Sequence, residues 1–284
     1  MVELNDYLSR IEAILKTGID KYETLEGGMI GEVFKLELQD ERTMVLKTGD
    51  TPMKIEAAML GHLKNESKLP VPEVYYSTEN FILMEFIEGE TLNDHDIESE
   101  AAEYLAKLHS IKEYGFGFDY DTLTGPIIQP NDYMGSWIEF FKNNRLLYMN
   151  KKALDSNSIS RSLYERIIEL SDRLSLILNE PESPSLIHGD VWKINIIVIG
   201  DQIQAFLDPA IYYAHPEIEL SYISFAETFC DEFYKQYDER SGIEDGFFEE
   251  RCKIYQLYPL LVHAHLFDDD DPYMIDKKLQ EIEF

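Results

Sequence analysis

Three polar residues, separated by two apolar runs, constrain this chain more than any other feature. Asp190 and Asn195 stand in the segment 186–195, which reads LIHGDVWKIN, and Asp208 stands in the segment 206–209, which reads FLDP. The apolar runs at 196–199 and 203–207 are typical of β-strands. Paired strands of this kind would present the three polar residues at their ends. We therefore expect a strand–turn–strand unit that gathers two carboxylates and one amide.

This set of groups suits the transfer of a phosphoryl group to an alcohol. The carboxylate of Asp190 would take the proton of a hydroxyl group, and oxygens of Asn195 and Asp208 would bind magnesium. Phosphoryl transfer depends on positioning and charge neutralisation more than on covalent chemistry by the protein. The sequence therefore predicts Asp190 as the catalytic base, with Asn195 and Asp208 as metal ligands.

The composition is that of a folded, soluble enzyme. The chain has 284 residues, of which 44% are hydrophobic and 12% aromatic, enough for a substantial core. No apolar run is long enough to span a bilayer, and the N-terminus lacks the pattern of a signal peptide. We expect the two cysteines, Cys230 and Cys252, to be reduced thiols of a cytoplasmic protein rather than a disulfide.

The net charge is strongly negative. Against 55 acidic residues stand 25 basic ones, which gives a formal charge of −30. Such a chain repels nucleic acid and anionic lipid, so neither is expected as a partner. The charge forms either a solvated surface or an electrostatic funnel for a cationic substrate, and the sequence leaves both interpretations open.

The hydrophobic patterns divide the chain into two parts. An amphipathic helix is expected at 4–18, followed by hairpins at 32–47 and 73–85 with a helix at 53–64 between them. From about residue 97 helical patterns dominate. We expect a two-lobed α+β fold, with a small β-rich nucleotide-binding lobe at 1–88 and a larger, mainly helical catalytic and acceptor-binding lobe at 89–284.

The N-terminal part contains groups suited to binding a nucleotide. Gly28 and Gly31 precede the first hairpin, where small residues let backbone N–H groups approach phosphates. Lys47 ends an apolar strand, and Glu56 on the following helix would hold it against the α- and β-phosphates. Two residues at the end of the second hairpin would offer their backbone groups to adenine: Glu85 and Ile87.

Further motifs lie in three places along the chain: after the first helix of the large lobe, after the proposed metal-binding aspartate, and in the closing helix. They are Tyr114-Gly-Phe-Gly-Phe118, Gln129-Pro-Asn131, Trp137, Phe140-Phe141, Arg145-Leu146, Tyr212-Tyr213, His215, Glu217, Glu219-Leu220, Tyr255-Gln-Leu-Tyr258, Leu261, His263 and Leu266-Phe267. With these, the chain resembles the fructosamine (ketosamine) kinases, within the wider aminoglycoside-phosphotransferase-like kinases, from about residue 27 to residue 273. The resemblance implies a protein-kinase-like fold, ATP and magnesium (Mg²⁺) as cofactors, and a small-molecule acceptor, a sugar hydroxyl of a ketosamine.

Five residues are expected beside the acceptor: Trp137, Trp192, His215, Glu217 and Glu219. The two carboxylates among them would bind an ammonium group of an amine-bearing sugar. One departure leaves the acceptor open, because the family usually has small residues where this chain has Lys193-Ile194. The alternatives are an aminoglycoside- or choline-type kinase of the same fold, or a non-catalytic nucleotide-binding module.

Overall fold

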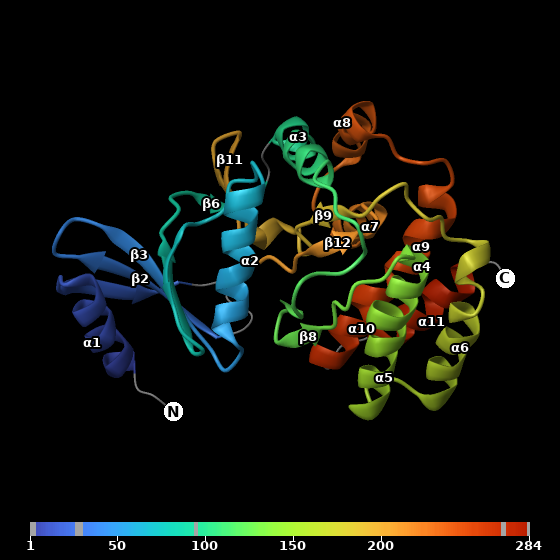
Figure 1. The fold of residues 1–284 in the computed structure, drawn as a ribbon, viewed down its shortest axis with the longest axis horizontal. Coiled ribbons are helices and arrows are strands. Elements are labelled where there is room, and N and C mark those ends of the chain that lie inside the picture. Colours follow the sequence, from blue (N-terminus) through green and yellow to red (C-terminus); the bar gives the residue numbers. More distant parts are fainter. Residues whose placement is uncertain (1–3, 26–30, 94–95, 268–270, 283–284) are drawn as a thin grey trace.

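The protein combines a β-rich N-terminal part with a larger, mainly helical C-terminal part, arranged side by side along the long axis (Figure 1). This computed structural model describes residues 4–25, 31–93, 96–267 and 271–282. The predicted α+β class is therefore confirmed. No helix within these ranges is long and apolar enough to cross a membrane. The division after residue 88 stays a proposal.

The N-terminal part is an antiparallel five-stranded sheet with a helix on each face. Its strands lie in the order β1-β2-β3-β5-β4, and both predicted hairpins are present. The elements are α1 (Leu4–Leu15), β1 (Ile19–Thr24), β2 (Glu32–Leu38), β3 (Thr43–Thr48), α2 (Met53–Glu66), β4 (Val74–Ser77) and β5 (Phe81–Glu85). The first helix is three residues shorter than predicted, because Lys16 takes a left-handed backbone with φ 57°.

Side chains of β3 alternate between the two faces, because a strand has a period of two. Met44 and Leu46 pack on the face that α1 covers, whereas Val45 packs on the face that α2 covers. Figure 1 shows the two helices on opposite sides of the sheet. The same alternation sends Lys47 toward α2, and this direction matters for the site.

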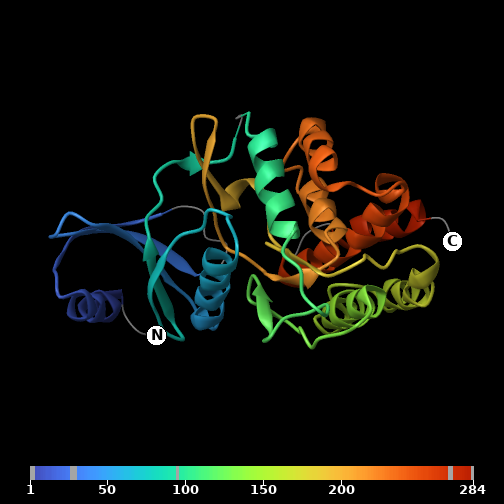
Figure 2. The same ribbon diagram turned by 45° about the horizontal axis from the view of Figure 1, so that its top comes forward.

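The C-terminal part packs helices around a core that is rich in aromatic side chains. In Figure 2, α3 and α8 lie side by side, and they are in extensive contact. A π-helical segment (Phe141–Leu147) joins α4 to α5 without a break. The helices are α3 (Glu98–His109), α4 (Trp137–Phe140), α5 (Tyr148–Asp155), α6 (Arg161–Ser171), α7 (Glu217–Phe225), α8 (Asp231–Ser241), α9 (Cys252–Tyr255), α10 (Leu257–Leu266) and α11 (Asp271–Glu281).

Short strands in the C-terminal part carry the predicted polar residues. The pairs are β9 (Ser185–Ile187) with β12 (Tyr212–Ala214), β7 (Thr122–Thr124) with β8 (Ile127–Gln129), and β10 (Ile196–Ile199) with both β11 (Gln202–Phe206) and β6 (Glu90–Thr91). The predicted strand–turn–strand unit is β10 and β11, in which Ile196 stands opposite Phe206. Asn195 and Asp208 therefore emerge at the same end of this pair.

The two cysteines are free thiols, as the sequence predicts. Cys230 is exposed at the start of α8, and Cys252 is buried in the core.

Candidate active site

Lys47 is held between two carboxylates that come from different parts of the chain. On α2, Glu56 shares a face with Met53, Ala57 and Leu60, which bury that face against the sheet. The Lys47 Nζ lies 2.8 Å from Glu56 Oε1 and 2.8 Å from Asp208 Oδ1. Burial opposes the charge on the ammonium group, but the two carboxylates outweigh it and raise the pKa of Lys47. The site therefore keeps a fixed positive charge.

Asp190 lies in a tight turn that follows β9. Gly189 has φ 86°, and a Cβ at this position would come within 2.2 Å of the Ala210 carbonyl oxygen, so only glycine fits. The Asp190 Oδ2 accepts a hydrogen bond of 3.0 Å from Asn195 Nδ2, and its carboxylate is also hydrogen-bonded to the Tyr222 side chain. Burial raises the pKa of Asp190 to about 7, against the opposing effect of these bonds.

Asn195 and Asp208 form a pair of oxygen donors next to Asp190. The Leu207 N–H donates to the Asn195 carbonyl at 2.8 Å, which fixes the two segments against each other. Asp208 has a left-handed backbone with φ 51°, and its side chain is 43% exposed. The described residues contain no cluster of three or more His, Cys, Asp or Glu side chains suited to a metal. Two protein ligands suit Mg²⁺ that keeps waters and phosphate oxygens.

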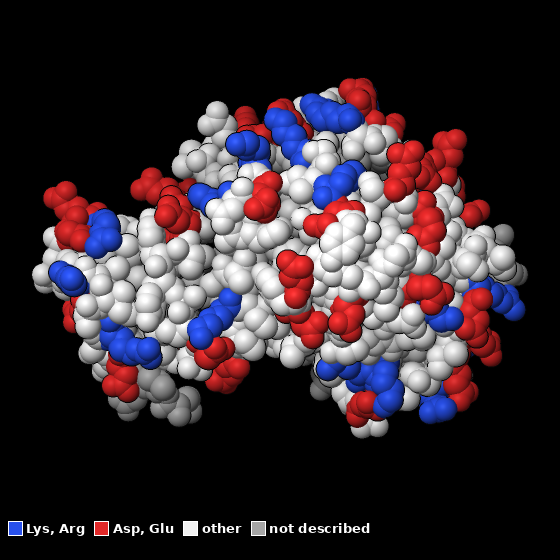
Figure 3. Space-filling model, in the orientation of Figure 1, with Lys and Arg blue, Asp and Glu red and all other residues white. Residues whose placement is uncertain are grey.

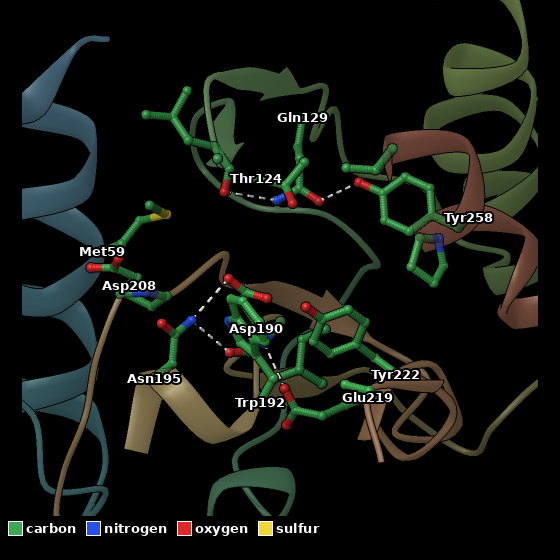
Figure 4. A pocket seen from close by; sticks show the side chains of 18 of the residues that line it. Met59, Thr124, Gln129, Asp190, Trp192, Asn195, Asp208, Glu219, Tyr222 and Tyr258 are labelled. Atoms are coloured by element: carbon green, nitrogen blue, oxygen red, sulfur yellow. Dashed lines mark hydrogen bonds between the residues drawn. The ribbon is translucent and has the colours of Figure 1, made fainter. Parts of the chain in front are cut away.

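A cavity of about 580 Å³ joins these groups (Figure 4). Lys47, Glu56, Asp190, Asn195 and Asp208 all line it, and so does Trp192, which is half-buried. The structure therefore brings together all five groups of the predicted catalytic set. The same wall includes Ile194, whereas Lys193 is exposed and lines a separate pocket.

The predicted nucleotide-binding backbone is described in part. Gly31 has φ 82°, and a Cβ there would come within 2.0 Å of the Thr48 carbonyl oxygen, which leaves room for glycine alone. Gly28 lies outside the described residues. Glu85 ends β5, and its N–H donates to the Glu73 carbonyl at 2.8 Å. Within the described ranges, the N–H of Ile87 bonds to no group of the protein.

Three residues expected beside the acceptor lie elsewhere. Trp137 is fully buried among aromatic rings and donates a hydrogen bond of 2.8 Å from Nε1 to the Tyr255 hydroxyl. Glu217 is buried in an ion pair with Arg251, at 2.6 Å. His215 is 4% exposed, and burial lowers its pKa to about 3. None of the three lines the cavity. The prediction that these three residues lie beside the acceptor is therefore wrong, because each is buried in the core.

Glu219 does line the cavity, but its carboxylate is already bound. Oε1 accepts from the Gly189 N–H at 2.5 Å, and Oε2 contacts His109 Nε2 at 2.7 Å. Burial opposes the charge, yet the bonds to His109 and Gly189 hold the pKa of Glu219 below its usual range. The prediction that Glu219 binds an ammonium group of the substrate is therefore wrong. Glu219 instead fixes the turn that carries Asp190.

Two features of the site escape the sequence analysis. The hydroxyl of Tyr222 approaches Asp190 from α7, and the Tyr258 hydroxyl donates to Gln129 Oε1 at 2.8 Å across the cavity wall (Figure 4). No local motif marks Tyr222 as a partner of Asp190, since 32 positions separate them. Tyr258 and Gln129 belong to motifs of the sequence, but these motifs do not indicate a contact between the two side chains.

Comparison with known proteins supports the class that the fold and the site define. With a TM-score of 0.70, the structure resembles an aminoglycoside phosphotransferase solved with AMP-PNP and hygromycin B, at 16% identity over 96% of each chain. It also resembles a candidate fructosamine-3-kinase from Haemophilus somnus, with a TM-score of 0.85 and 27% identity over 98% of this chain and 97% of that one. The chain is thus a phosphotransferase of the protein-kinase-like fold that acts on an alcohol group.

The family follows from the sequence profiles and the curated relatives. The fructosamine kinase profile matches residues 6–282. A "probable ketoamine kinase" of Pasteurella multocida is 31% identical over 78% of this chain and 77% of its own length. The chloroplastic protein-ribulosamine 3-kinase of Arabidopsis thaliana is 31% identical over 88% of this chain and 79% of its own length. The chain belongs to the fructosamine kinase family.

Proposed function

We propose that the protein is an ATP-dependent kinase that phosphorylates a sugar hydroxyl of a small ketosamine. The observation that carries this proposal is the meeting of five groups in one cavity: Lys47, Glu56, Asp190, Asn195 and Asp208. Family membership supports the ketosamine as acceptor, since curated relatives carry the names ketoamine kinase and ribulosamine kinase. A cytoplasmic location is part of the proposal and is supported by two free thiols.

The chain's own residues fit ATP and Mg²⁺. Glu56 would keep Lys47 in place against the phosphates, and oxygens of Asn195 and Asp208 would hold the metal. When bound, the magnesium complex of ATP would supply the phosphoryl group, and its metal ion would neutralise negative charge on the phosphates during the transfer. The bridge from Lys47 to Asp208 at 2.8 Å holds the cation next to the carboxylate that would bind the metal.

Nucleotide binding would also use backbone groups of the N-terminal part. The glycine at position 31 leaves its backbone open to a phosphate, and Gly28 would take the same role. The free N–H of Ile87 is a donor suited to a ring nitrogen of adenine. The carbonyl of Glu85 would accept from the amino group of the base.

Asp190 would orient the acceptor hydroxyl and take its proton. Its Oδ2 accepts a hydrogen bond from Asn195, and the Tyr222 hydroxyl is a second donor to the carboxylate. An incoming hydroxyl group would share or replace the Tyr222 bond, because both are donors to one carboxylate.

The proposal is tested by ADP release with matched acceptors. The panel contains fructosamines and ribulosamines of one amine, the corresponding free sugars, an aminoglycoside and choline. We expect magnesium-dependent ADP release with the ketosamines and little with the free sugars. Preference for the aminoglycoside or for choline would support the alternative kinase. Absence of turnover with every acceptor, together with retained ATP binding, would point to a binding module.

A further inference from the structure

The acceptor side of the cavity is lined by apolar side chains that remain partly exposed. They come from the segment that follows Asp190, from α7 and from the C-terminal end of α10: Trp192, Ile194, Tyr222, Phe225, Leu266 and Phe267. Partly exposed apolar surface that is gathered in one concave place is typical of a binding site. A sugar alone would leave much of this surface in contact with water.

Three of these rings, together with the ring of His263, form a continuous row that begins at the catalytic carboxylate. Tyr222, which is hydrogen-bonded to Asp190, has its ring centroid 6.3 Å from that of Phe225. Phe225 lies 5.3 Å from His263, and His263 lies 5.7 Å from Phe267. All four rings line the cavity. The row therefore leads from Asp190, where the acceptor hydroxyl would react, to the apolar end of the cavity at Phe267.

The carboxylates of the described cavity wall are already engaged and are not available to bind a cationic group of the acceptor. Glu56 and Asp208 share the ion pair with Lys47, Asp208 is also the proposed metal ligand, and Glu219 is bound by His109 and the Gly189 N–H. Asp190 is committed to the reacting hydroxyl. None of these carboxylates is therefore available to bind a charged group on the amine substituent. The wall offers this substituent apolar contacts instead.

Building on the proposed function, we propose that this row is a subsite for an apolar amine substituent of the ketosamine, either an alkyl chain or an aryl ring. The sugar would present its hydroxyl to Asp190, and the substituent on nitrogen would lie along Tyr222, Phe225 and Phe267. The ring faces near Asp190 also suit the ammonium nitrogen that joins the two parts, because a cation is attracted to an aromatic face. The substrate class is thus N-alkyl and N-aryl ketosamines.

The test is a series of ketosamines with one sugar and amine substituents of increasing length. Methyl, propyl, pentyl and benzyl substituents are compared with carboxymethyl and aminobutyl substituents of similar size. Burial of one methylene group corresponds to about a fourfold gain, so kcat/KM should rise by up to about that factor per carbon from methyl to pentyl. The benzyl compound should match the pentyl compound, and the charged compounds should fall below the alkyl compounds of equal length.

Two variants separate the subsite from a general effect of hydrophobicity. Phe225→Ala should flatten the dependence of kcat/KM on chain length, and Leu266→Gln is a second test if the first variant does not fold. The matched control is Phe248→Ala, because Phe248 is 46% exposed and does not line the cavity. This control should keep the full dependence and the basal activity.

The outcomes also separate the subsite from the function on which it rests. Turnover of every ketosamine with equal kcat/KM, or preference for the charged substituents, would overturn the subsite and leave the kinase function intact. A length dependence that Phe225→Ala and Leu266→Gln leave unchanged would place the apolar contact elsewhere and also overturn it. Absence of turnover with all the ketosamines would overturn the proposed function and the subsite together.

Discussion

Asp190 carries the reaction in the proposed mechanism, and its replacement is the most direct test at the residue scale. Asp190→Asn keeps the size of the side chain but removes the base, so turnover should fall by at least about a hundredfold. ATP affinity should stay close to that of the wild type, because the residue holds no phosphate. Steady-state ADP release and calorimetric titration with ATP measure the two effects. Near-normal turnover in this variant would assign Asp190 a structural role.

Asp208 should affect a different quantity. Asp208→Asn removes one anionic oxygen from the proposed metal site and one of the two carboxylates that hold Lys47. Nucleotide affinity should therefore weaken by about tenfold or more in magnesium. In EDTA the loss should be much smaller, since no metal is then bound. Equal losses in both conditions would show that Asp208 acts through Lys47 rather than through a metal.

The buried side chain of His215 should make the stability of the fold depend on pH. Burial, with Arg251, Lys112 and His109 as nearby positive charges, lowers its pKa to about 3, while Glu217 lies 3.8 Å away but is already paired with Arg251. Below about pH 6.5 the unfolded chain binds a proton that the folded chain rejects, so stability should fall as the pH drops. From pH 7.5 to 5.0 this histidine should contribute a loss of up to about 2 kcal/mol.

Urea unfolding of the wild type and of His215→Gln at the two pH values measures this contribution. The variant lacks the titrating ring, so its free energy of unfolding should decrease less between pH 7.5 and 5.0. His188, whose pKa burial lowers to about 4, should remain as a residual source of acid sensitivity. An identical decrease in wild type and variant would contradict the assignment to His215.

At the scale of elements, the contact between β3 and α2 sets the position of Lys47. A double-mutant cycle with Lys47→Met and Glu56→Gln on kcat/KM for ATP should show a coupling of about 1 kcal/mol or more. The first substitution already breaks the pair, so the second removes little further. The matched control is the pair Lys54 and Glu79, also 2.8 Å apart but with side chains 57% and 62% exposed. There the effects should be small and additive. Additivity at the buried pair would mean that Glu56 does not position Lys47.

The elements also show where sequence patterns suffice. The two hairpins were predictable because each joins alternating or apolar runs through a short polar turn. The pairing of β9 with β12 was not, since each strand has three residues and 24 residues lie between Ile187 and Tyr212. Asn195 and Asp208 of the predicted catalytic set were predictable as neighbours, because they flank the local strand pair of β10 and β11.

Two of the predictions that were wrong, those for Glu217 and Glu219, concern carboxylates whose partners are distant in the chain. Glu217 is bound by Arg251, which is 34 residues away, and Glu219 is bound by His109, which is 110 residues away. Nothing in the sequence around α7 shows that these charges are already neutralised. Burial and long-range pairing decided their roles, and neither quantity can be read from local spacing.

At the scale of the whole molecule, the strongly negative formal charge is the main electrostatic feature. Figure 3 shows acidic side chains spread over the visible face, with basic ones among them. The internal carboxylates Glu217 and Glu219 are both paired, and so they give no support to an acidic funnel at the acceptor pocket. The interpretation as a solvated surface is therefore the simpler one for the formal charge of −30.

This charge has a consequence for the proposed nucleotide, because ATP is itself an anion. Surface charges repel it over a distance that shrinks from about 30 Å at 0.01 M salt to about 8 Å at 0.15 M. Lys47 attracts it within a buried site, where salt screens much less. Added salt should therefore remove mainly the repulsion. We expect the affinity for ATP, with magnesium held constant, to increase severalfold between these two conditions.

Adenosine is the matched control, because it has the same base without the charge. Its dissociation constant should change little between 0.01 M and 0.15 M salt. Titration of both ligands, followed by calorimetry, gives the comparison. If ATP bound more weakly as salt was added while adenosine did not change, local attraction would dominate over the surface charge. The net charge of −30 would then have no measurable effect on the nucleotide, and its role would be confined to the solvation of the protein surface.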